Sequence, residues 1–158
     1  MKTNYLFPYQ MKKFGWILLI PGIILGLFFL IDQSEPNFLN VTVFSIAEQA
    51  IFSDSLFFTL TENNILDEII GLLLITGAIL IAFSKEKHED EFILKIRLES
   101  LVWAIYLNYA VLILTLIFIY DMIFFWVLVF NMFTLLFFFI IRFNWALMKS
   151  KKQIRDEE

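Results

Sequence analysis

The chain has 158 residues, of which 60% are apolar and 20 are Phe, and its mean hydropathy is +0.79. Soluble domains average ~45–50% apolar residues, and a chain of this length has too little interior to hide the excess from water. The composition therefore predicts a single-domain integral membrane protein. The absence of Cys excludes a disulfide framework, a thiol nucleophile and a thiolate metal site. The net charge of −4 says little by itself, because the charges are sorted along the chain.

Four apolar runs follow one another, and each has about the length needed to cross a bilayer. The hydrocarbon core is ~30 Å thick, which takes about 20 helical residues. The last two runs are separated only by Asp121, but one helix through both would be ~60 Å long, so the chain must turn there. We predict an all-α four-transmembrane-helix bundle with spans at 14–31, 66–84, 101–120 and 122–143.

The positions of Lys and Arg predict which end of each span faces the cytoplasm. All 12 lie before the first span, between the second and third, or from Arg142 onward at the end of the fourth. None lies between Asp32 and Glu68. By the positive-inside rule, we expect a multi-pass protein of the cell inner membrane with both termini in the cytoplasm. Trp16, Trp103 and Trp145 fall near the inner boundary, where interfacial aromatic residues gather.

The segment 32–65 is too apolar for a disordered linker. Residues 39–43 alternate like a short strand, and Ser45 with Glu48 fits a capping box that opens a short helix toward Phe52. We predict a small extracytoplasmic cap packed on the helix ends. Ligand binding by this cap is the alternative.

The segment 85–100 is dense in charges of both signs and predicts a cytoplasmic stem of the third span, while 144–158 predicts a cytoplasmic tail. Three acidic residues of the stem are candidates for docking a protein partner: Glu89, Asp90 and Glu91. The alternative is a solvated collar of charge. A metal site at His88 is disfavoured, because the chain has no second His and no zincin spacing.

Two pairs of polar residues are predicted to meet across the hairpin of the last two spans. Asn108 and Asn131 lie at nearly equal distances from the turn, so an amide–amide hydrogen bond is expected to join them. Glu99 and Arg142 are expected opposite each other at the inner boundary. We interpret the Asn pair as interhelical contact rather than a solute or proton path, because the spans contain no titratable relay.

Small residues predict close packing of the first two helices. Gly22 and Gly26 form a Gly-x-x-x-Gly motif, which lets helix backbones approach closely. The second span offers Gly71, Ala78 and Ala82 along one face. We favour packing within one chain, with a dimer face as the alternative.

Several chemistries find no support in the sequence. It contains no Gly-x-Ser-x-Gly, P-loop, His-Glu-x-x-His or intramembrane carboxylate pair, so we predict no enzyme activity and no cofactor. Direct nucleic-acid binding is not expected, because acidic residues are interleaved with the basic ones on the same side.

Three short motifs run from 82 to 101: Ala-Phe-Ser-Lys-Glu-Lys, Glu-Asp-Glu-Phe and Arg-Leu-Glu-Ser-Leu. Together with Asn108-Tyr109 and 131–133 they resemble a signature of small uncharacterised bacterial four-span membrane proteins. The resemblance covers roughly 63–143. It implies no activity. Some proteins of this group are encoded beside small helix-turn-helix regulators, which implies a regulatory partner.

We therefore expect a non-enzymatic membrane component, regulatory or accessory, that lies in the lipid bilayer and acts through a partner. The partner classes are a cytoplasmic protein, a membrane protein or a second copy of the chain. Transport of a small solute or ion is the alternative function, and a membrane enzyme is the third.

Overall fold

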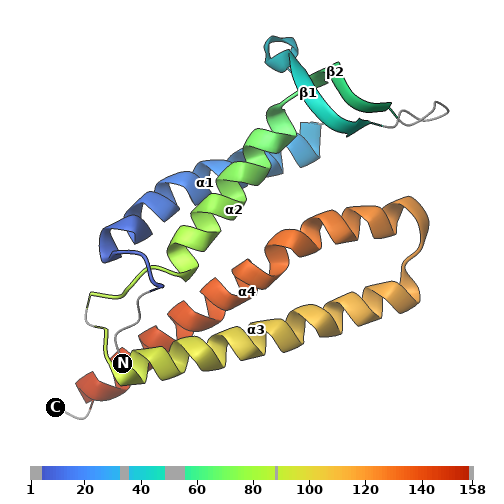
Figure 1. Cartoon of the computed structure of the whole chain (residues 1–158). Coiled ribbons are helices and arrows are strands. Elements are labelled where there is room, and N and C mark those ends of the chain that lie inside the picture. Colours follow the sequence, from blue (N-terminus) through green and yellow to red (C-terminus); the bar gives the residue numbers. More distant parts are fainter. Residues whose placement is uncertain (1–4, 33–35, 49–55, 88, 157–158) are drawn as a thin grey trace. The chain divides into compact units, whose positions relative to one another are not determined.

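The structure is a computed structural model that describes residues 5–32, 36–48, 56–87 and 89–156. These residues form helices and one two-stranded sheet (Figure 1). In chain order the elements are α1 (Tyr9–Asp32), the 3-10 helix η1 (Asn37–Leu39), β1 (Asn40–Glu48), β2 (Leu56–Asn64), α2 (Leu66–Ala82), α3 (Glu91–Phe118) and α4 (Asp121–Asp156). The chain divides into a helical unit, residues 1–19 and 74–158, and a hairpin unit, residues 20–73.

The predicted all-α bundle of four transmembrane helices is wrong. Within the described residues, three helices are long and apolar enough to cross a membrane: α1, α3 and the part Asp121–Ser150 of α4. α2 has 17 residues and ends at Ala82 rather than at 84. It ends there because the residues that follow are extended and pair with Phe7. Two strands between α1 and α2 also exclude an all-α fold.

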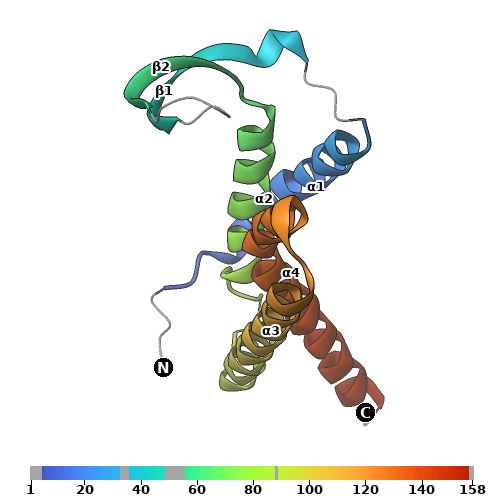
Figure 2. The ribbon, with the colours of Figure 1, turned by 90° about the vertical axis from the view of Figure 1, so that its right-hand side faces the viewer.

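In the helical unit, α3 and α4 run antiparallel and lie side by side (Figures 1 and 2). α3 ends at Phe118 and α4 begins at Asp121, which takes a positive φ of 58° in the turn. The core includes Ala104 of α3 with Phe139 and Phe143 of α4, all at most 2% exposed. Only 11% of the most apolar window of each helix is buried. The remaining apolar surface suits contact with lipid.

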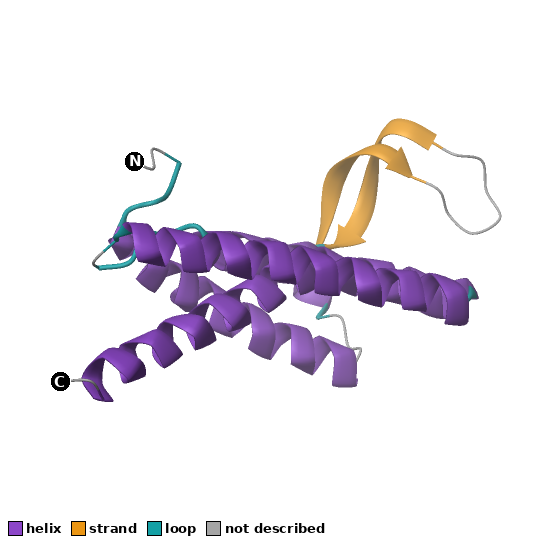
Figure 3. Ribbon diagram, turned by 90° about the horizontal axis from the view of Figure 1, so that it is seen from below, coloured by secondary structure: helices purple, strands orange, loops and turns teal. Residues whose placement is uncertain are grey.

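In the hairpin unit, β1 and β2 form an antiparallel sheet, drawn in orange in Figure 3. The register runs from Asn40 opposite Asn64 to Glu48 opposite Leu56. The helix predicted from the capping box at Ser45 is wrong, because residues 45–48 belong to β1. β-branched and aromatic residues on both strands favour the sheet over the local cap. The predicted continuation toward Phe52 lies outside the described residues.

Asparagine side chains fasten the base of the hairpin to the start of α2. The Nδ2 of Asn64 donates to the Oδ1 of Asn40 at 2.6 Å, and its Oδ1 accepts from the backbone N–H of Leu66 at 3.2 Å. The Nδ2 of Asn63 donates to Glu68 at 2.7 Å. Further out, one face of the sheet leaves large apolar side chains 62–70% exposed: Phe44, Ile46, Phe58 and Leu60.

Candidate functional site

The connection between α2 and α3 is held by a backbone bridge to the N-terminal segment. Phe7 pairs in parallel with Ser84, donating to the carbonyl of Phe83 and accepting from the N–H of Lys85, each at 2.9 Å. Ser84 is fully buried, and its hydroxyl donates to the carbonyl of Leu80. This bridge fixes the backbone just before the candidate docking residues Glu89, Asp90 and Glu91.

Arg97 lies at the centre of the polar contacts near this connection. The side chain comes from α3 and the residue is only 8% exposed. Its Nη1 donates to the carbonyls of Ala82 at 2.9 Å and Ser84 at 3.2 Å. The last carbonyls of a helix lack partners within the helix and carry partial negative charge. The guanidinium therefore caps the C-terminal end of α2.

The Nη2 of Arg97 contacts both carboxylate oxygens of Glu89, at 3.1 and 3.2 Å. The same carboxylate accepts a 2.7 Å hydrogen bond from the backbone N–H of Glu86. Side-chain exposure in the Arg97–Glu89 pair is 9% and 14%, so water screens the pair weakly. The side chain of Glu89 is therefore turned inward, where it stabilises the connection between α2 and α3.

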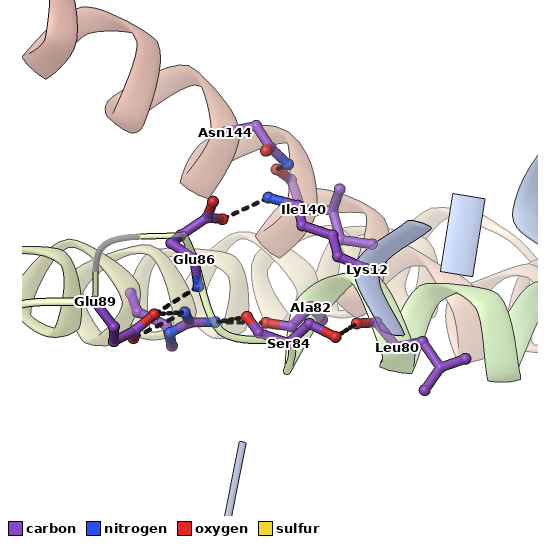
Figure 4. Close-up of polar contacts among 9 residues, drawn as sticks. Lys12, Leu80, Ala82, Ser84, Glu86, Glu89, Ile140 and Asn144 are labelled. Atoms are coloured by element: carbon purple, nitrogen blue, oxygen red, sulfur yellow. Dashed lines mark hydrogen bonds and ion pairs between the residues drawn. The ribbon is translucent and has the colours of Figure 1, made fainter. Parts of the chain in front are cut away.

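A second ion pair joins this connection to α1. The ammonium group of Lys12 contacts the carboxylate of Glu86, and both side chains are about one-seventh exposed. Figure 4 shows the carboxylate of Glu86 turned toward Lys12, and that of Glu89 turned toward the backbone nitrogen of Glu86. We refer to the group Lys12, Ser84, Glu86, Glu89 and Arg97 as the Arg97 cluster.

An aromatic stack supports the Arg97 cluster from α4. The rings of Phe139 and Phe143 are stacked with centroids 5.7 Å apart, and Phe83 stacks on Phe139 at 5.9 Å. The Cζ of Arg97 lies 4.6 Å from the centroid of Phe143, within cation–π range. The Arg97 cluster therefore joins the C-terminal end of α2 and the first turns of α3 to residues of α1 and α4.

The chemistry of the Arg97 cluster is that of a structural network. Each of its two carboxylates is paired with a cation, and that of Glu89 also accepts a hydrogen bond from a backbone N–H group. Among the described residues, no group of three or more His, Asp or Glu side chains could hold a metal ion. One orphan remains in this part of the chain: the buried Nε of Arg97 has no hydrogen-bond partner.

The other two predicted docking residues have different surroundings from Glu89. Asp90 is the N-cap of α3, where its Oδ1 accepts from the backbone N–H of Ile93 at 2.8 Å. Glu91 is exposed in the first turn. It begins a stripe of exposed charge that continues one and two turns later with Lys95 and Glu99, whose charged atoms are 3.9 Å apart.

The two Asn residues predicted to meet across the hairpin do lie together. The Nδ2 of Asn131 donates to the Oδ1 of Asn108 at 3.2 Å, and the reverse contact measures 3.5 Å. Asn108 is only 5% exposed. Amide pairs of this kind contribute ~0.6 kcal/mol on average in membranes. The pair therefore forms a polar contact between α3 and α4.

The predicted pairing of Glu99 with Arg142 is not among the ion pairs of the described residues. Glu99 is paired with Lys95 on its own helix. The guanidinium of Arg142 lies over two indole rings, those of Trp103 and Trp145. The residue count from the turn placed the two residues at similar depth, but the helical phase turns Glu99 to the exposed side.

The small residues take part in packing to very different degrees. Gly22 is buried, and Ala78 and Ala82 are at most 2% exposed. A Cβ on Gly26 would meet the side chain of Ile70 at 3.4 Å, whereas one on Gly71 would meet nothing within 4 Å. Gly26 is thus a packing position, and Gly71 is not.

A closer approach than that at Gly26 involves Gly15 and Gly77, which lie outside the predicted Gly-x-x-x-Gly motif. A Cβ on Gly77 would lie 2.7 Å from the backbone nitrogen of Leu19 and 3.0 Å from the carbonyl oxygen of Gly15. A Cβ on Gly15 would lie 2.8 Å from the side chain of Ile81. α1 and α2 are therefore in backbone contact here. Gly15 stands seven residues before Gly22, and extending the Gly-x-x-x-Gly face by two turns would have found it.

No family model matches the chain, and neither a curated protein nor a solved structure matches it. The resemblance to small bacterial four-span membrane proteins therefore stays a prediction.

Proposed function

We propose that this protein is a non-enzymatic component of the cell inner membrane that acts through a cytoplasmic protein partner. The observation that carries the proposal is the exposed stripe Glu91, Lys95 and Glu99 on the first turns of α3. This stripe stands on a helix whose start is fixed by the Asp90 cap and the Arg97 cluster. A charged surface on a rigid base loses little conformational entropy when a partner binds.

The membrane placement rests on two further observations. α1, α3 and α4 carry apolar surfaces long enough to cross a bilayer. The Lys and Arg residues gather around the start of α1, from the end of α2 into the first turns of α3, and in the C-terminal part of α4. By the positive-inside rule these ends face the cytoplasm. Both termini share that side because α2, although it has only 17 residues, returns the chain to the end where α1 starts, and Ser84 pairs there with Phe7.

Cysteine labelling tests this orientation without a background, since the chain has no Cys. In intact cells, a membrane-impermeant maleimide should label Met122→Cys at the α3–α4 turn, where Met122 is 67% exposed. Lys87→Cys and Lys149→Cys should be labelled only after the cells are opened. Labelling of Lys87→Cys in intact cells would contradict the proposed orientation.

Photo-cross-linking in cells tests the partner. A photoreactive residue at Glu91 or Lys95 should give an adduct with one protein, whereas the same residue at Glu62, an exposed position on β2, should not. The double variant Glu91→Lys with Glu99→Lys should abolish an adduct formed from Lys95 by reversing the charge pattern, and its thermal stability should stay unchanged. Equal adducts from all three positions, or adducts only with a second copy of the chain, would rule out a cytoplasmic partner at this surface.

A further inference from the structure

A hollow on the surface of the helical unit lies between α3 and α4, near the end where the basic residues gather. Its volume is about 270 Å³, and it is lined by Trp103 of α3 with Ile141, Arg142 and Trp145 of α4. These four residues place a guanidinium group, two indole rings and an aliphatic side chain around one space. Arg142, which the sequence assigned to a pairing with Glu99, is the only charged residue of the lining.

Two aromatic contacts hold the guanidinium of Arg142 in place. Its Cζ lies 5.2 Å from the ring centroid of Trp145 and 5.8 Å from that of Trp103. Contacts with aromatic faces orient a guanidinium but leave its N–H groups, which lie in its plane, available as donors. Among the described residues, the ion pairs use Lys12, Lys95 and Arg97 as cations. The site therefore offers a positioned charge of the kind that binds phosphate through two parallel hydrogen bonds.

The surroundings of Arg142 change from apolar to cationic along α4. On the membrane side are Ile141, which is 66% exposed, and Phe138, whose ring meets Trp103 edge-on at 6.5 Å. Toward the C-terminal end, Trp145 and Lys149 follow Arg142 on one helical face, three and seven residues later. Lys149 is exposed. This order matches that of a phospholipid, whose acyl chains lie on the membrane side of the phosphate and whose remaining headgroup lies on the aqueous side.

We propose that this hollow binds the headgroup phosphate of an anionic phospholipid of the cytoplasmic leaflet. Arg142 donates to the phosphate, the two indoles enclose it at the interface, and Lys149 favours a headgroup with net negative charge. Basic pockets between helices on the cytoplasmic side are the usual sites for such headgroups. The inference rests on the membrane placement proposed above and is independent of the docking partner.

Binding of phosphatidylglycerol and phosphatidylcholine to the purified full-length protein in detergent, followed by native mass spectrometry, tests the site. Phosphatidylglycerol should bind the unmodified protein more tightly than phosphatidylcholine. Arg142→Gln should weaken phosphatidylglycerol binding about tenfold, as expected when charge-assisted hydrogen bonds are lost. Arg142→Lys should recover part of it, and Lys149→Gln should reduce the preference for phosphatidylglycerol over phosphatidylcholine.

Lys95→Gln is the matched control, since it removes the same charge from an exposed position on α3. It should leave phosphatidylglycerol binding unchanged. An equal loss in Lys95→Gln and Arg142→Gln would show diffuse attraction and overturn the site. So would equal affinity for the two lipids, or displacement of the lipid by millimolar inorganic phosphate, which would assign the site to a free anion. A failure here leaves the cross-link at Glu91 unaffected, so the two proposals are tested separately.

Discussion

Gly77→Ala should destabilise the protein by about 1–3 kcal/mol, the usual cost of overpacking a tight contact. The added Cβ would lie 2.7 Å from the backbone nitrogen of Leu19 and 3.0 Å from the carbonyl oxygen of Gly15. Both atoms belong to the backbone of α1, which cannot turn aside as a flexible side chain can. The two helices must separate, and the packing around the contact is lost. Thermal unfolding in detergent measures the effect.

Gly71→Ala is the control for Gly77→Ala, because it makes the same chemical change six residues earlier on the same helix. Nothing lies within 4 Å of its added Cβ, so its stability should be unchanged or slightly higher. Gly15→Ala should behave like Gly77→Ala, since its Cβ meets the carbonyl oxygen of Gly77 at 2.9 Å. Equal midpoints for the Gly71 and Gly77 variants would show that the helix contact is looser than described.

The apolar helices could be predicted from the sequence because lipid imposes one simple constraint. A run must be long and apolar enough to cross the bilayer with its backbone hydrogen bonds satisfied inside the helix. Runs at 14–31, 101–120 and 122–143 meet it, and each lies within or nearly within α1, α3 or α4. The end of α2 depended instead on a contact with Phe7, 77 residues from Ser84 in sequence, which no local pattern contains.

The hairpin was missed because two local signals competed at residues 45–48. Ser45 and Glu48 have the spacing of a capping box, but Phe44 and Ile46 continue the alternation of the preceding strand. The partner strand decides between them. β2 contributes Phe57 and Thr59, residue types that fit a pleated sheet. A helix cap contributes about one side-chain hydrogen bond, whereas the pairing of two nine-residue strands contributes several backbone hydrogen bonds.

Glu89, Asp90 and Glu91 were predicted to form one acidic docking surface, but each has different contacts in the structure. Glu89 belongs to the Arg97 cluster, Asp90 caps α3, and Glu91 faces outward. Charge density alone could not separate these roles, because they depend on how the chain reverses after α2. A signal for Arg97 was present, however. Arg97 shares a helical stripe with Ile93, Ser100, Ala104 and Asn108, and a charge on a buried stripe needs a partner.

Replacement of Arg97 by leucine should have the largest effect of any substitution in the Arg97 cluster. It leaves the carboxylate of Glu89, only 14% exposed, without a cation, and it uncovers the carbonyls of Ala82 and Ser84. Removing one partner of a buried ion pair costs about 3–5 kcal/mol. The expected result is a strong loss of thermal stability in detergent, together with rapid proteolysis within residues 83–90.

A matched control and a double variant separate the ion pair from simple loss of volume. Lys95→Leu changes a cation two residues away whose side chain is 74% exposed, and its exposed pair contributes only ~0.2–1 kcal/mol. The double variant Arg97→Leu with Glu89→Leu should recover part of the stability lost in Arg97→Leu, because no charge is then left buried and unpaired. The uncovered carbonyls of α2 should keep it below the unmodified protein. If Arg97→Leu and Lys95→Leu unfold at the same temperature, Arg97 is solvated and the cluster does not fix the start of α3.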